Sequence, residues 1–189
     1  MRNHFVMTLL AVLFFLSGSA PASPPIAISA EDLQSLETRA IRGDADAQNK
    51  LGELYFRGQG VPLNNTTARK WFEKSAAQGK AEAQYNIGFL YDKAQEDYVK
   101  ALEWYQKAAA QRHADAQYNL GYLYAYGRGV PQDYVRAYMW WNLAAQSTSN
   151  VEESEESILD KVARRMTPAQ IAEAQRLSQQ CQARQFVGC

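Results

Sequence analysis

Residues 116–124 read Ala116-Gln-Tyr-Asn-Leu-Gly-Tyr-Leu-Tyr124, and two earlier stretches follow the same pattern: Ala47-Gln-Asn-Lys-Leu-Gly-Glu-Leu-Tyr55 and Ala83-Gln-Tyr-Asn-Ile-Gly-Phe-Leu-Tyr91. A second pattern, such as Ala101-Leu-Glu-Trp104-Tyr-Gln-Lys-Ala-Ala109, follows each copy. The first pattern recurs after 36 and then 33 residues, and the second after 33 and then 36. Repeats of this length are typical of stacked solenoids, in which each unit buries its apolar face against its neighbours.

Apolar residues within each copy have helical spacing. Ala83, Ile87 and Leu90 lie at i, i+4 and i+7, which places them on one face of a helix. The second pattern has a stripe of its own, so each unit is predicted to be an antiparallel helix pair, and the fold to be all-α without a convincing strand. Glycine and proline mark the turn within the first and third pairs, at 58–62 and 127–131. The middle pair lacks this loop, so its turn is expected to be tighter or partly helical.

Glycine recurs inside the first helix of every pair, at Gly52, Gly88 and Gly121. Each costs about 1 kcal/mol of helix stability relative to alanine. Their recurrence predicts that a neighbouring helix comes too close for a side chain. The tryptophans of the second pattern are predicted to lie in the core: Trp71, Trp104, Trp140 and Trp141.

The N-terminus has the layout of a secretory signal peptide. Arg2 precedes an apolar run at 5–16, and small residues at Ala20 and Ala22 follow. Residues 1–22 are therefore predicted to be cleaved, which implies a periplasmic or secreted protein with no integral membrane segment afterwards. The alternative is a membrane-spanning helix, but a run of twelve residues falls short of the roughly 20 that a bilayer requires.

The composition after residue 22 is nearly neutral, with 19 Lys and Arg against 20 acidic residues. No basic stripe exists to neutralise phosphates, so nucleic-acid binding is not expected. The only two cysteines are Cys181 and Cys189, and in an exported chain this pair predicts a disulfide that pins Phe186 and the tail. Zinc is the competing interpretation, but two thiols and a distant histidine are too few ligands for a closed site. Neither a metal nor a cofactor is expected.

The segments outside the repeats are predicted to cap the stack. Residues 23–42 would form a linker and a capping helix, and residues 147–189 would form capping helices with a disulfide-closed tail. One of these helices is expected to start near Ser149-Asn150, with four glutamates in its first turns. The last helix is expected to open at Thr167-Pro168.

The repeated residues resemble the Sel-one-like repeat, a helix-pair module related to the tetratricopeptide repeat. Its pattern is Leu-Gly-x-x-Tyr, then Gly-x-Gly-Val, then Ala-x-x-Trp-Tyr-x-Lys-Ala-Ala. Units 43–79 and 113–146 match it throughout, and unit 80–112 lacks only the glycine loop. The resemblance implies a right-handed α/α superhelical solenoid, a concave face lined by the first helices, and an adaptor or regulatory role without catalysis.

One candidate binding surface lies on the first helices, away from the stripe that meets the second helices. It consists of Asn49, Glu53, Tyr85, Phe89, Tyr118 and Tyr122. Aromatic rings with polar tips are favoured anchors of peptide and protein contacts. Glu82, Asp92 and Asp115 lie on or beside this row, so the groove is expected to be mildly acidic. The alternative is that the rings only pack between adjacent repeats.

Catalytic signals are weak. His113 is the only histidine after residue 22, and the pattern places no serine or free thiol beside it. The Gly-x-Gly loops follow helices and lack a third glycine, unlike dinucleotide fingerprints. We therefore predict a monomeric, non-catalytic adaptor of the bacterial cell envelope that binds a protein or peptide. The alternatives are a cell-wall-active hydrolase or β-lactam-binding protein, and a purely structural interaction with peptidoglycan or an envelope complex.

Overall fold

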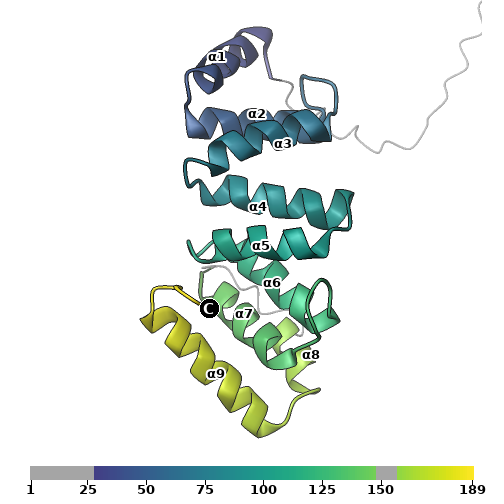
Figure 1. Cartoon of the computed structure of the whole chain (residues 1–189), viewed down its shortest axis with the longest axis vertical. Helices are drawn as coiled ribbons and strands as arrows, with labels where there is room; N and C mark the ends of the chain where they lie inside the picture. The colour runs from purple at the N-terminus through teal and green to yellow at the C-terminus, as the bar shows by residue number, and fades with distance from the viewer. Residues whose placement is uncertain (1–27, 148–156) are drawn as a thin grey trace, which may run out of the picture.

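The computed structural model describes residues 28–147 and 157–189, and the predicted signal peptide and the predicted helix start near Ser149 lie outside these ranges. The described residues form helices and turns without a strand. In chain order the helices are α1 (Ala30–Ile41), α2 (Ala45–Arg57), α3 (Asn65–Ala76), α4 (Ala81–Phe89), the π-helical turn η1 (Leu90–Ala94), α5 (Tyr98–Ala109), α6 (Ala114–Tyr126), α7 (Tyr134–Ser147), α8 (Ile158–Ala163) and α9 (Pro168–Ala183). Figure 1 shows them stacked in order from α1 to α9 along the long axis.

The helix pairs are α2 with α3, α4 with α5, and α6 with α7, and the first two pairs each pack against the following pair. The helical glycines make this close packing possible. A Cβ atom added at Gly52 would lie 2.5 Å from the Phe72 ring, and one at Gly88 would lie 2.7 Å from the Tyr105 ring. At Gly121 the nearest atom would be Nε1 of Trp141, at 2.6 Å. The prediction that a neighbouring helix excludes a side chain is confirmed in all three repeats.

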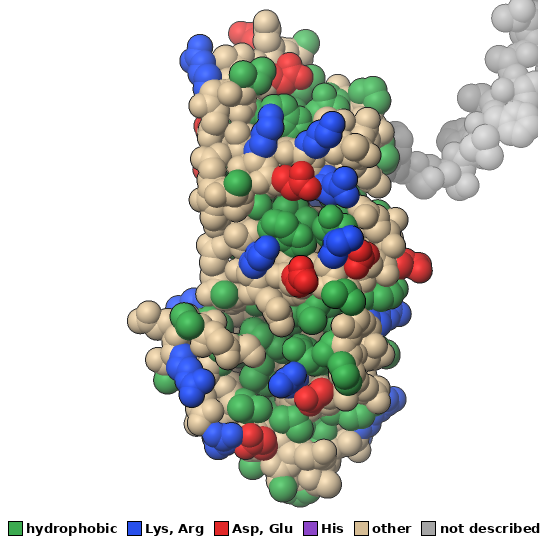
Figure 2. All heavy atoms as spheres, viewed as in Figure 1, with side chains coloured by type: hydrophobic (Ala, Val, Ile, Leu, Met, Phe, Trp, Pro, Cys, Tyr) green, Lys and Arg blue, Asp and Glu red, His purple; other side chains and the backbone are tan. Residues whose placement is uncertain are grey.

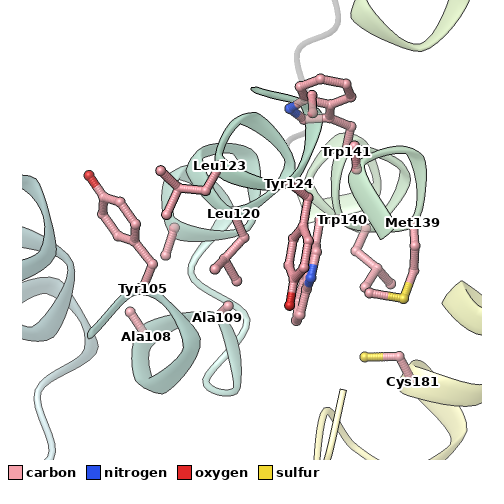
Figure 3. Close-up of a cluster of buried hydrophobic side chains, with 14 of the residues drawn as sticks. Tyr105, Ala108, Ala109, Leu120, Leu123, Tyr124, Met139, Trp140, Trp141 and Cys181 are labelled. Atoms are coloured by element: carbon pink, nitrogen blue, oxygen red, sulfur yellow. The ribbon is translucent and has the colours of Figure 1, made fainter. Parts of the chain in front are cut away.

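The core runs through the stack as three clusters of small and aromatic residues. Figure 3 shows part of the largest cluster, where Trp140 lies beside Tyr124 between α6 and α7, and Met139 points toward Cys181 on α9. Trp140 and Trp141 are buried, as predicted. Trp71 and Trp104 are only partly buried, which corrects the expectation for these two.

Trp71 and Trp104 are only partly buried because the tryptophan position of the repeat faces outward in the first two repeats. Lys74 Nζ lies 4.1 Å from the centre of the Trp71 ring, and Lys107 Nζ lies 3.9 Å from that of Trp104. These are cation–π distances. The ring of Trp140 is buried in the third repeat because α9 packs against α7.

The turns follow the glycine pattern. Gly58 and Gly127 end α2 and α6 in the left-handed conformation, each with φ of 65°. In the middle repeat the chain instead continues from α4 into η1, so the expected partly helical turn is found. Asp92, within η1, is buried and accepts a hydrogen bond from the Tyr105 hydroxyl at 3.3 Å.

The C-terminal end is closed by α8 and α9. Ser157 caps α8, and Thr167 and Gln170 form a capping box at the start of α9. Cys181 and Cys189 form the predicted disulfide, and Phe186 between them is 6% exposed, with the Arg112 guanidinium 5.6 Å from its ring centre. Within 28–147 and 157–189, no helix combines the length and apolarity needed to cross a bilayer.

Candidate partner-binding face

The six predicted site residues occupy two equivalent positions in three repeats. The first position holds Asn49, Tyr85 and Tyr118, and the second holds Glu53, Phe89 and Tyr122. Both positions lie on the first helix of a pair, α2, α4 or α6, four residues apart and therefore on one face. The structure thus lines these side chains up along the stack, but it gives them different surroundings in each repeat.

Polar contacts occupy the face in the first repeat. Asn49 is 6% exposed, and its Nδ2 donates to Glu53 Oε1 at 2.9 Å. Its Oδ1 accepts from Nδ2 of Asn86 in the next repeat at 3.0 Å. Glu53 also pairs with Lys50 at 3.1 Å. Because Asn49 bridges two repeats, its amide is engaged within the stack.

Aromatic packing partly buries the face in the second repeat. The Tyr85 ring stacks on His113 with centroids 4.7 Å apart and lies 5.8 Å from the Tyr105 ring. Phe89 meets the edge of Phe56 from the first repeat at 5.9 Å. Burial raises the pKa of the Tyr85 phenol, and the carboxylates of Asp115 and Glu82 raise it further. These two rings contribute to packing between repeats as well as to the face.

Open aromatic surface is found in the third repeat. Tyr118 is 44% exposed and Tyr126 is 58% exposed, and Tyr122 lies between them at i+4 along α6. The rings of Tyr122 and Tyr126 are 4.4 Å apart. We call Tyr118, Tyr122 and Tyr126 the tyrosine stripe. It is the part of the face that has no further repeat stacked on it.

The electrostatic character changes along the face. Asp92 is buried against Tyr105 and Lys93, so the expectation that it adds to an acidic groove is wrong. The Arg128 guanidinium lies 5.3 Å from the Tyr122 ring and 6.0 Å from the Tyr126 ring. Acidic side chains therefore lie on α2, at Glu53, and near the starts of α4 and α6, whereas Arg128 makes the turn after α6 basic.

His113 is held by two contacts at the junction of the second and third repeats. Its Nε2 lies 2.8 Å from Glu82 Oε2, and its Nδ1 accepts from the Ala116 amide at 3.3 Å as the N-cap of α6. The hydrogen bond from His113 holds the pKa of Glu82 below its usual value, although burial of the carboxyl acts in the opposite direction. Both ring nitrogens of His113 are thus hydrogen-bonded within the stack.

Replacing His113 with alanine should cost about 1 kcal/mol through the lost cap. His113→Asn keeps a capping oxygen but loses the stack on Tyr85 and the Glu82 contact, and the Glu82 contact should account for a few tenths of a kcal/mol in this partly exposed pair. A lowered folded-state pKa stabilises the protein above the unfolded value of about 4.5, and this contribution disappears as the pH falls through the folded value. Urea unfolding at pH 7 and pH 3 should show a smaller gap between wild type and His113→Asn at pH 3, because the Glu82 contribution to that gap decreases as the carboxylate is protonated. A gap that widens at pH 3 would contradict the assignment.

The basic end of the face was not predicted from the sequence. Tyr126 continues the row one turn beyond Tyr122, and this i+4 spacing was a usable signal. Arg128 and Lys93 were not predictable in this role, because their placement depends on the turn after α6 and on η1. Among the described residues, no group of three or more histidine, cysteine or acidic side chains is arranged to hold a metal ion.

Comparison with known families matches the Sel1 repeat to residues 45–80, 81–113 and 114–149. The chain belongs to the Sel1 repeat family. These repeats generally act as adaptors in protein interactions. The predicted right-handed α/α solenoid is also confirmed, since the Sel1 repeat protein from Oxalobacter formigenes has a similar structure, with a TM-score of 0.58 and 38% identity over 62% of this chain and 48% of that one.

Two curated relatives match shorter stretches of the chain. The putative sel1-like repeat-containing protein L21 of Acanthamoeba polyphaga mimivirus is 38% identical over 56 residues, which are 30% of this chain and 10% of that protein. The ERAD-associated E3 ubiquitin-protein ligase component HRD3A of Arabidopsis thaliana is 36% identical over 62 residues, 32% of this chain and 9% of that protein. This Sel1 repeat chain therefore matches about a tenth of the length of these relatives.

Proposed function

We propose that this Sel1 repeat protein is a monomeric, non-catalytic adaptor of the bacterial cell envelope that holds a protein or peptide on the face formed by α2, α4 and α6. The observation that carries the proposal is the tyrosine stripe on α6, in which Tyr118 and Tyr126 are exposed and Tyr122 between them is partly buried. Such rings contribute much contact area at little cost in conformational entropy. The packed residues of the same row, Asn49, Glu53, Tyr85 and Phe89, fix the orientation of α4 relative to its neighbours and complete the face.

An exported location supports the same proposal. The Cys181–Cys189 bridge suits an oxidising compartment, and residues 1–22 have the layout of a signal peptide. The wall-hydrolase alternative finds less support, because His113 is committed to Glu82 and to the cap of α6. HRD3A is named as a component of a ligase, a description that fits an adaptor role for these repeats.

The proposal is tested by capturing envelope proteins with the purified chain and with a Tyr118→Ala, Tyr122→Ala variant. Partners held by the wild-type chain should be lost from this variant, while its helical circular dichroism signal is retained. A matched control is Ile41→Ala with Leu63→Ala, which removes exposed apolar side chains, 76% and 65% exposed, away from the row. The control should keep the partners. Retention of the partners by the tyrosine variant would refute the proposed face.

A further inference from the structure

A cleft of about 420 Å³ lies between the third repeat and α8. One side is aromatic, formed by Tyr126 of α6 with Tyr134 and Trp141 of α7. The other side is α8 and the turn that follows it, held against the core by Val162, which is 5% exposed. The volume falls within the range of ligand pockets and has room for a few side chains of a partner.

Within 28–147 and 157–189, the charged side chains that line this cleft are all basic, namely Lys161, Arg164 and Arg165. Arg165 Nη1 donates to the Tyr134 hydroxyl at 3.0 Å, and its guanidinium carbon lies 5.8 Å from the ring centre. Among the described residues, no carboxylate pairs with Lys161 or Arg165. Basic residues at the end of a short helix also favour its dipole, but the contact with Tyr134 directs Arg165 over an aromatic wall.

The cleft is continuous with the tyrosine stripe. Tyr126 belongs to both, and Trp141 in the cleft wall lies 6.3 Å from the Tyr118 ring. Arg128 extends the positive charge along the stripe, 5.3 Å from the Tyr122 ring. An extended segment lying on the stripe would therefore reach the cleft with rings beneath it and cations around it.

We propose that this cleft and the stripe bind an acidic peptide segment, with an aromatic or aliphatic side chain against Tyr126 and Trp141 and carboxylates at Lys161 and Arg165. This inference rests on the adaptor function proposed above and names the chemistry of the partner. Charge complementarity favours a segment rich in aspartate and glutamate, since opposite potentials steer and align partners. Nucleic acid is the competing occupant of a basic aromatic site. It is disfavoured because the whole chain carries no net positive charge, with 20 basic and 20 acidic residues.

The test is fluorescence anisotropy of the purified protein, disulfide intact, with a labelled peptide of alternating glutamate and phenylalanine. Binding should weaken at least tenfold when every glutamate of the peptide is replaced by glutamine, and it should weaken with added salt. Lys161→Glu with Arg165→Glu should also reduce affinity at least tenfold. Lys161→Gln with Arg165→Gln should give an intermediate loss, which keeps the test valid if the charge reversal unfolds α8.

A charge-matched control is Arg57→Glu with Lys70→Glu, which changes two exposed cations on α2 and α3 and should leave peptide binding unchanged. Equal loss in this control would overturn the proposal, as would tighter binding of a single-stranded oligonucleotide of the same charge. A further variant changes four acidic residues of the chain itself to glutamine: Glu152, Glu153, Glu155 and Glu156. If the peptide binds only to this variant, the chain's own acidic residues compete for the cleft. That result would overturn binding of an external segment.

The capture experiment separates this inference from the adaptor function. If capture of the partners requires Tyr118 and Tyr122 but is unchanged by the Lys161 and Arg165 substitutions, the adaptor function is supported and the acidic-segment proposal is refuted. Partners lost with Lys161 and Arg165 but kept without the two tyrosines would refute the stripe as the binding face.

Discussion

Tyr105→Ala is expected to lower the free energy of unfolding by about 3–5 kcal/mol, as large-to-small changes of buried aromatic residues do. Tyr105 is fully buried, at 0% exposed, and its ring occupies the space that Gly88 leaves open. Its removal would empty the contact between α4 and α5. It would also take the hydroxyl away from the buried carboxylate of Asp92.

Tyr105→Phe is the matched control. It keeps the ring and removes only the 3.3 Å hydrogen bond to Asp92, so its cost should stay below about 1.5 kcal/mol. Lys93 still pairs with that carboxylate at 2.9 Å. Urea unfolding followed by circular dichroism gives both values, provided that the m-value is unchanged. Similar losses in the two variants would contradict the packing role assigned to the ring.

Gly129→Ala is expected to cost about 2–4 kcal/mol. Gly129 has φ of +68°, which disfavours a side chain, and an added Cβ would lie 2.6 Å from the carbonyl carbon of Tyr98 and 2.8 Å from the Val99 nitrogen. These neighbours are backbone atoms at the start of α5, so they cannot relieve the clash by a change of rotamer, as a flexible side chain could. The turn after α6 would have to lift away from the second repeat.

Gly79→Ala isolates the conformational part of that cost. Gly79 also has positive φ, +85°, but a Cβ there would meet nothing within 4 Å. Its loss should be about 1 kcal/mol, since the left-handed strain is partly offset by reduced freedom of the unfolded chain. Chemical denaturation of both variants measures the difference. Equal losses at the two positions would show that the contact of Gly129 with α5 is unimportant.

The repeat made most of the fold predictable. Helix pairs, their order and the crowding at Gly52, Gly88 and Gly121 all follow from a pattern that recurs three times, because equivalent residues must occupy equivalent positions. The disulfide was predictable because no other cysteines compete. The outward position of Trp71 and Trp104 was not predictable. A large ring near a lysine fits the sequence pattern of a buried position and equally that of a surface position.

The candidate face was predictable in its position but not in its exposure. Tyr85 and Tyr118 are equivalent in sequence, yet Tyr85 stacks on His113 of the next repeat and Tyr118 has no such repeat beyond it. The cleft beside α8 lies outside the repeating pattern altogether. Its positive charge depends on how α8 packs against the repeats. The period of the repeats does not determine this packing.

A photo-crosslinking amino acid in place of Tyr118 is the most direct test of partner binding on the face of the first helices. The protein would be crosslinked in the cells that make it, and products would be compared with those from the same amino acid at Glu103, an exposed position on α5. A crosslinked partner is expected at position 118 and none at position 103. Crosslinks at position 103 alone would place the partner on the second helices and contradict binding on the face of the first helices.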